Sequence, residues 1–129
     1  MKKLGLVFSL FMFTAFIFAS NAFATVLYYG SKVDIINITS SSYQVRYGGE
    51  TMADSAKPSV SVYSHVFFNG IKKTSETKTA RNTNYVSLSN TTPGSGFNVS
   101  GTWSTHSYHS DDGFATEKYS FDTVSWFPN

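Results

Sequence analysis

Three histidines are the side chains of this sequence best suited to metal binding or acid–base chemistry. His106 and His109 lie close to the carboxylates Asp111 and Asp112, whereas His65 stands apart. Imidazole nitrogens together with a carboxylate suit zinc or copper. On an extended strand, however, residues three apart point to opposite faces, so His106 and His109 share a site only if the chain bends. We therefore expect ordinary histidines beside a turn, with no metal and no other cofactor.

Motifs for catalysis are missing as well. None of the eighteen serines after residue 24 lies in a Gly-x-Ser-x-Gly setting, and the chain has no cysteine. The glycine-containing stretch 92–96 lacks the lysine and the following helix that a phosphate-binding loop needs. The adjacent pair Asp111 and Asp112 precedes Gly113, a pattern typical of a turn. The sequence therefore predicts no catalytic residues and no enzyme activity.

The composition predicts which elements position these side chains. After residue 24 the chain contains two leucines, four alanines and one methionine, the residues that favour helix most. β-branched and aromatic residues are abundant instead, and these fit the pleated surface of a sheet. No window shows apolar residues at helical spacing. We conclude that the fold is all-β.

One β-hairpin is strongly indicated. Val60, Val62, Val66 and Phe68 share one face of an alternating segment. The pair Asn69-Gly70 follows at once and tolerates the positive φ angles of a tight turn, after which residues 71–80 return as a polar strand.

A second hairpin is expected from residues 98–110 and 115–126, with its turn at 111–113. On the returning strand Tyr119 and Phe121 share one face, whereas Val124 and Trp126 fall on the other. This change of phase predicts a bulge or a crossing between sheets near Asp122.

Shorter segments complete the expected fold. Strands are predicted at 26–29, 33–38, 43–47 and 85–89, and residues 48–58 are expected to form an irregular connection. Segments at this spacing favour a small antiparallel two-sheet β-sandwich of about seven or eight strands over a closed barrel. The sandwich is expected to be a single domain covering residues 25–129.

The first 24 residues predict export. Lys2 and Lys3 form a basic start, residues 4–19 carry no charge, and the small residues Ala22 and Ala24 occupy the positions that signal peptidase recognises. The uncharged run is shorter than the roughly 18 residues that span a bilayer. We therefore expect a secretory signal peptide over residues 1–24 that is cleaved after Ala24. The product is expected to be secreted to the extracellular space, with no membrane span after signal removal.

Removing the signal changes the charge of the chain. The full sequence has a formal net charge of +2, but residues 25–129 carry eight basic and eight acidic side chains. A nucleic-acid-binding domain usually shows a basic surplus on one face. Nucleic acid is therefore not an expected partner.

The remaining functional signal is an excess of aromatic residues on a neutral chain. Sixteen aromatic residues follow residue 24, more than a core of this size needs. A displayed tyrosine or tryptophan offers a rigid apolar plane with a polar tip, which suits carbohydrate or protein contact. The chain is therefore expected to act by non-catalytic binding at a cell surface, to cell-wall carbohydrate or to an extracellular protein. The candidate binding residues are Trp103, Tyr108, Tyr63 and Tyr85.

One segment resembles a known family. The stretch from Gly101 to Tyr108 contains Gly-x-Trp followed by histidine and tyrosine. It is similar to the element that opens the mature chain of bacteriocins of the lactococcin 972 type, although here it lies near the C-terminus. These bacteriocins are secreted, cysteine-free β-sandwiches. The resemblance implies an alternative function, an antibacterial effector that acts on the cell wall of related bacteria.

Overall fold

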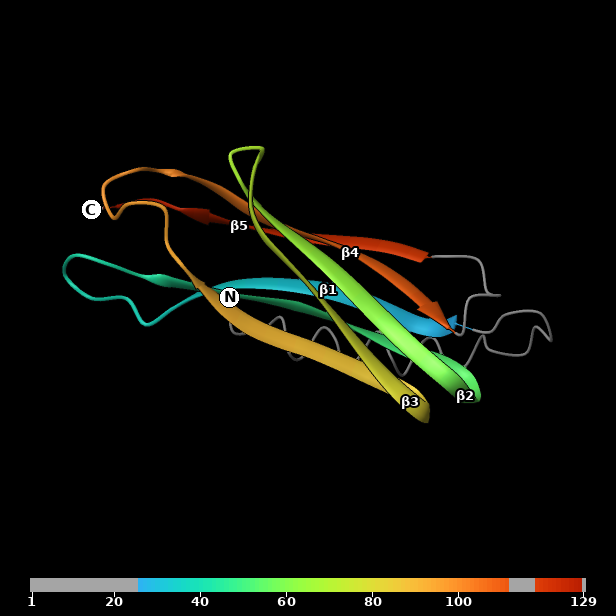
Figure 1. The fold of residues 1–129 in the computed structure, drawn as a ribbon. Coiled ribbons are helices and arrows are strands. Elements are labelled where there is room, and N and C mark those ends of the chain that lie inside the picture. Colours follow the sequence, from blue (N-terminus) through green and yellow to red (C-terminus); the bar gives the residue numbers. More distant parts are fainter. Residues whose placement is uncertain (1–25, 112–117, 129) are drawn as a thin grey trace.

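A computed structural model describes residues 26–111 and 118–128, and these residues form five antiparallel strands (Figure 1). The described residues contain no helix, and the all-β fold is confirmed. The expected signal peptide and its cleavage site lie outside the described residues, as do Asp112 and Gly113 of the second predicted turn. The strands are β1 (Val26–Ile36), β2 (Gln44–Phe68), β3 (Ile71–Pro93), β4 (Gly101–Asp111) and β5 (Lys118–Trp126).

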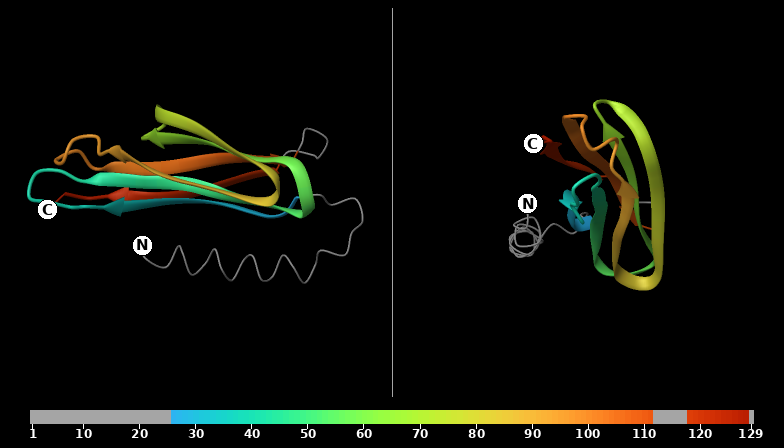
Figure 2. Two further views of the ribbon diagram at one scale, coloured as in Figure 1. Left: turned by 60° about the horizontal axis from the view of Figure 1, so that its bottom comes forward. Right: turned by 90° about the vertical axis from the view of Figure 1, so that its left-hand side faces the viewer.

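The long strand β2 organises a single sheet. Its first half pairs with β1, its second half pairs with β4, and β3 runs along its other side for most of its length. The order across the sheet is β1-β2-β4-β5, with β3 pairing β2. The sheet curls strongly, as the view along the strands shows (Figure 2). The described residues therefore form one curled sheet of five strands, and the expected two sheets of seven or eight strands are not observed.

A bend in β2 lets one strand serve both halves of the sheet. The register with β3 shifts between Met52 and Lys57, and Asn82 on β3 has a positive φ of 54°. The inward positions change from odd to even numbers across this bend, from Val45 to Val60. The prediction of an irregular connection over residues 48–58 was wrong, because a bulge bends the strand without ending it.

The glycines before this bend belong to the strand. A Cβ atom on Gly48 would lie 1.8 Å from the backbone oxygen of Leu88 on β3. Glycine is therefore required at this position for close approach of two strands, although the sequence pattern indicated a strand end.

The turn between β2 and β3 matches its prediction. Asn69 and Gly70 have φ angles of 50° and 82°, the left-handed values that a tight hairpin turn needs. The backbone nitrogen of Asn69 donates to the Thr102 carbonyl over 2.9 Å, and the Thr102 nitrogen donates to Asn69 Oδ1 over 2.9 Å. These bonds attach the turn to the beginning of β4.

The core lies inside the curl, where distant parts of the sheet meet. Trp103 is fully buried, and its indole nitrogen donates to the Tyr43 hydroxyl over 3.0 Å. The Tyr43 ring stacks on Trp126 with centroids 4.1 Å apart. A second buried cluster packs beside the bend and includes Val60 and Leu88. The main cluster consists of Val33, Tyr43, Val45, Tyr47, Val66, Phe68, Trp103, Val124 and Trp126.

β4 and β5 pair in a regular register from Gly101 opposite Trp126 to His109 opposite Lys118. Neither the bulge nor the crossing between sheets that was predicted near Asp122 is therefore observed. Both faces of β5 carry aromatic residues, because Trp126 enters the core whereas Phe121 faces outward. The change of phase in the sequence marks two differently used faces of one regular strand.

Side chains join the two edges that the curl brings together. The backbone nitrogen of Val33 on β1 donates to Asp122 Oδ2 on β5 over 3.1 Å. The hydroxyls of Ser31 and Ser120 lie 2.6 Å apart between the same two strands. The carboxylate thus satisfies an edge N–H group that no neighbouring strand pairs in the ladder.

Candidate functional site

Aromatic side chains from three strands line up on the outer face of the sheet. Register places Tyr63 of β2 opposite Tyr108 of β4, which lies opposite Tyr119 of β5. The next row contains His65, His106 and Phe121 in the same order. We call this surface the aromatic face and define it as Tyr63, His65, Phe67, His106, Tyr108, Tyr119 and Phe121.

The rings of the aromatic face contact one another across the strands. The Tyr108 and Tyr119 ring centroids lie 5.3 Å apart, and His106 stacks on Phe121 at 5.8 Å. Phe67 meets His106 edge-on at 5.2 Å. Such cross-strand ring pairs stabilise a sheet and also hold each ring in place.

Hydrogen bonds further fix the central histidine. His106 Nδ1 bonds to the Tyr119 hydroxyl, and His106 Nε2 lies 3.1 Å from Ser104 Oγ. Its neighbour His65 has a lowered pKa because burial, the charge of Lys72 and the proximity of His106 all disfavour protonation. Protonation of His65 is therefore sensitive to the charges of both Lys72 and His106.

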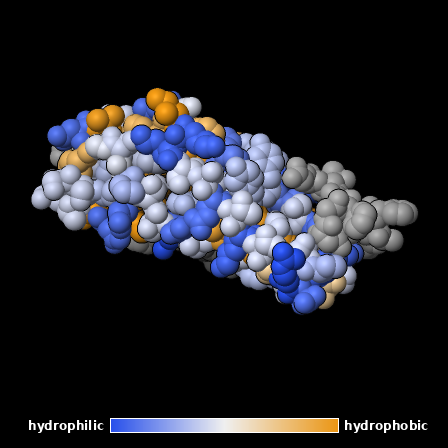
Figure 3. Space-filling view, in the orientation of Figure 1, coloured by the Kyte–Doolittle hydropathy of each residue, from blue (hydrophilic) through white to orange (hydrophobic). Residues whose placement is uncertain are grey.

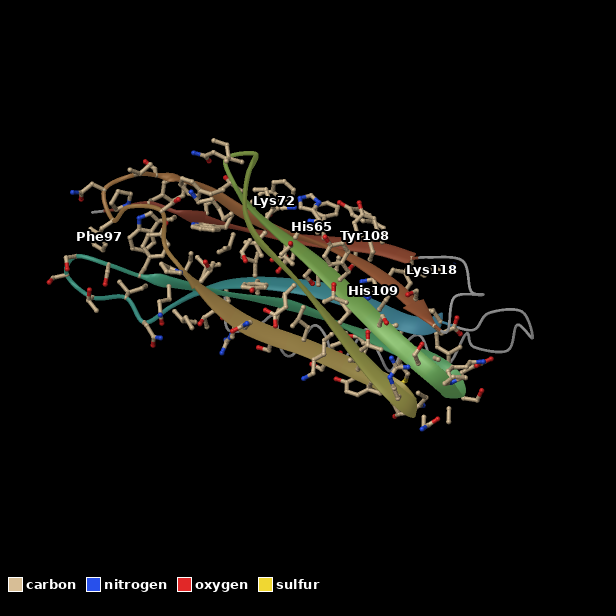
Figure 4. The ribbon with its side chains drawn as sticks, in the orientation of Figure 1. His65, Lys72, Phe97, Tyr108, His109 and Lys118 are labelled. Atoms are coloured by element: carbon tan, nitrogen blue, oxygen red, sulfur yellow. The ribbon has the colours of Figure 1, made fainter. Side chains whose placement is uncertain are left out.

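An open depression lies at the end of this face nearest the β2–β3 turn. Its volume is about 590 Å³. Figure 4 shows His65, Lys72 and Tyr108 gathered in this region along β2 and its neighbours. Phe67, Ser104 and His106 complete most of the lining. The depression thus combines aromatic planes with a lysine, a hydroxyl and two imidazoles.

Two of the four predicted binding residues lie in the aromatic face. Tyr63 and Tyr108 are exposed register partners. Tyr85 is also exposed but lies on the other half of β3, where burial and the neighbouring Glu50 raise its pKa. Trp103 is fully buried in the core, which contradicts the expectation that it is displayed. Its large apolar ring packs against Phe68, its register partner on β2.

Sequence reasoning missed the other members of the face. Tyr119 and Phe121 carried a usable signal, since both alternate with the core residues of β5. The change of phase along that strand predicts a bulge or a crossing between sheets, whereas the structure has an outward-facing aromatic row. His65 and His106 were noticed separately, but only the β2–β4 register shows that they are neighbours.

The third histidine belongs to a buried polar chain. His109 Nδ1 lies 2.8 Å from Thr51 Oγ1, and His109 Nε2 lies 2.7 Å from Ser120 Oγ. Ser120 in turn contacts Ser31, so the chain joins four strands. Burial lowers the pKa of His109 to about 4. A neutral imidazole donates through one nitrogen and accepts through the other, and hydroxyl partners satisfy both roles.

His106 and His109 point to opposite faces, as their spacing predicted. His109 shares the buried face with Asp111, whereas His106 lies on the aromatic face. The described residues contain no group of three or more histidine, aspartate or glutamate side chains placed to share a metal ion. Nor do they include a helix that is long and apolar enough to cross a membrane.

Neither a protein-family model nor a curated protein matches the sequence. Among solved structures the chain is similar to a CARDB domain from Pyrococcus furiosus, which was crystallised in complex with di-metal ions. The two are 12% identical, with a TM-score of 0.50, and the match covers 84% of this chain and 100% of that one. This similarity supports a CARDB-like β fold.

Proposed function

We propose that the protein is a secreted, non-catalytic binding module that contacts a cell surface or an extracellular partner through the aromatic face. The proposal includes removal of residues 1–24 by signal peptidase, so that the exported chain begins at Thr25. A neutral domain that is released outside the cell meets surfaces and polymers, which suits a role in contact.

The observation that carries this proposal is the exposure of large aromatic rings on a face that the core does not use. Burial normally removes such rings from water, and a contiguous exposed aromatic surface is characteristic of a binding site. The exposed fractions are 38% for Tyr63, 39% for Tyr108, 46% for Tyr119 and 61% for Phe121.

The strands also prepare these rings for binding. Each ring is anchored on a paired strand and touches neighbouring rings, so little side-chain entropy remains to be lost when a partner binds. On the side of the molecule seen in Figure 3, apolar residues form small separate spots among hydrophilic and intermediate ones. Scattered apolar residues of this kind favour a specific contact over non-specific hydrophobic association.

The test compares exposed aromatic residues on different halves of the sheet. Purified protein is incubated with isolated bacterial cell wall and with live indicator bacteria, and the bound fraction is measured. The double variant Tyr108→Ala with Phe121→Ala should weaken binding by more than about tenfold. Tyr85→Ala is the matched control, since Tyr85 is 36% exposed but lies away from the face.

Two outcomes would contradict the proposal. Equal binding by the double variant and the wild-type protein would show that the aromatic face is not the contact surface. Growth inhibition of the indicator bacteria by wild-type protein would favour the antibacterial alternative over a simple binding module.

A further inference from the structure

Charge is unevenly distributed between the two sides of the sheet half that carries the aromatic face. All three acidic residues that the structure describes on its strands fall on the inner side. Glu76 pairs with the buried Ser64, Asp122 pairs with the buried Thr105, and Asp111 is itself buried. In this part of the described chain, the outer side therefore carries no carboxylate, although the domain as a whole has no net charge.

A lysine occupies the depression on that outer side. Lys72 lies opposite Phe67 in the β2–β3 register and lines the depression together with His65 and Tyr108. No carboxylate forms an ion pair with Lys72 in the described part of the chain. Its charge reaches the depression, since it contributes to the lowered pKa of His65. The depression thus offers an unpaired cation beside aromatic rings.

The remaining lining suits a sugar. Aromatic rings provide flat planes on which the apolar faces of sugar rings stack, and Ser104 and the tyrosine hydroxyl provide hydrogen-bonding groups at the edges. A volume of about 590 Å³ lies within the range of pockets that hold small ligands or short stretches of a polymer. Because the depression is open and continues into the aromatic face, a polymer has room to extend beyond it.

We propose that the depression beside the β2–β3 turn binds an anionic saccharide, with Lys72 contacting the acidic group and the rings of Phe67 and Tyr108 contacting the sugar. This inference rests on the proposed function and adds the chemical class of the ligand. The shared chemistry is a sugar polymer that carries carboxylate or sulfate groups.

Binding to polymers of defined charge tests the inference. The purified protein is titrated with polygalacturonate, with dextran sulfate and with neutral dextran, at low and at high salt. We expect binding to one or both acidic polymers, weaker binding at high salt, and much weaker binding to neutral dextran. Polygalacturonate and dextran sulfate distinguish carboxylate from sulfate as the preferred group.

Two lysines of the same strand provide a matched pair of variants. Lys72→Gln should reduce affinity for the acidic polymer by about fivefold, as expected for one exposed charge contact. Lys78→Gln removes the same charge from an exposed position whose register partner, Val62, faces the core. This control should bind like the wild-type protein. Both variants should keep the wild-type melting curve, because each lysine is exposed on β3.

The possible results separate this inference from the function on which it rests. If Lys72→Gln binds acidic polymers as tightly as the wild type, or if neutral dextran binds equally well, the assignment of an anionic saccharide as the ligand is wrong. Loss of cell-wall binding after protease treatment of the wall would also overturn it, in favour of a protein partner. The binding function itself would still stand in these cases, provided that the Tyr108→Ala and Phe121→Ala double variant loses cell-wall binding.

Discussion

Acidification should destabilise the protein through His109. The imidazole is fully buried between Thr51 and Ser120, and burial lowers its pKa from 6.5 to about 4. In the unfolded chain the same group regains its ordinary pKa near 6.5. Between these two values the unfolded state binds a proton that the folded state does not, so stability falls as the pH falls.

The size of the effect follows from the two pKa values. One pKa unit corresponds to about 1.4 kcal/mol. The shift at His109 should therefore lower the free energy of unfolding by about 3 kcal/mol when the pH falls from 7 to 4. Asp122 acts in the opposite direction, because burial raises its pKa and the folded state then takes up a proton first. The contribution of His109 must therefore be measured as a difference between two proteins.

Urea unfolding at several pH values between 7 and 4 provides the measurement. Between pH 7 and pH 4 the wild-type protein should lose about 3 kcal/mol more stability than His109→Gln, which lacks the buried imidazole at position 109. Ser107→Ala serves as the control, because it removes the buried 2.7 Å contact with Ser64 without removing a titrating group. That variant should be less stable at every pH but keep the wild-type slope. Parallel loss of stability in the wild type and in His109→Gln would refute the buried neutral histidine.

Three further predictions concern stability and are checked by circular dichroism and urea unfolding. Val62→Pro should abolish folding, because it removes an N–H group from a strand that is paired on both sides. Lys78→Pro, on the edge strand β3, should destabilise the protein less. Equal loss of stability in the two variants would show that β3 is not an edge strand. Trp103→Ala should lower the free energy of unfolding by about 3–5 kcal/mol. Any loss of binding in this variant would therefore reflect a disrupted core, because Trp103 does not lie on the binding surface. Gly48→Ala should lower the free energy of unfolding by at least about 1–3 kcal/mol, since its Cβ would overlap the Leu88 backbone oxygen. Wild-type stability in this variant would show that the two strands can separate at this position without cost.

Local patterns were sufficient to predict the class of the fold and its best hairpin. The alternation of Val60, Val62, Val66 and Phe68 showed which face of that segment is buried, because side chains on a strand alternate between faces whatever the neighbouring strands are. The turn at Asn69-Gly70 was predictable for a similar reason, since these residue types adopt positive φ at low cost. The opposite orientations of His106 and His109 also followed from spacing alone.

Tertiary pairing decided which residues form the candidate site. Along β4 the row containing Trp103 and His109 and the row containing His106 and Tyr108 are similarly polar, so neither is identifiable as the buried row from sequence. Pairing with β2 places Trp103 opposite Phe68 in the core and brings His106 beside His65 on the surface. These contacts join residues about forty positions apart.

The bend in β2 could not be predicted for a related reason. A bulge changes which positions face inward, so a strict alternation rule fails across it and suggests two strands where the chain forms one. Residue types, period and turn chemistry are local properties and determined the all-β class, the tight hairpin and the excess of aromatic residues. The curl of the sheet, the burial of Trp103 and the assembly of the aromatic face depend on register between distant strands. Only the folded structure supplies that register, because the register depends on which residues of distant strands are buried together.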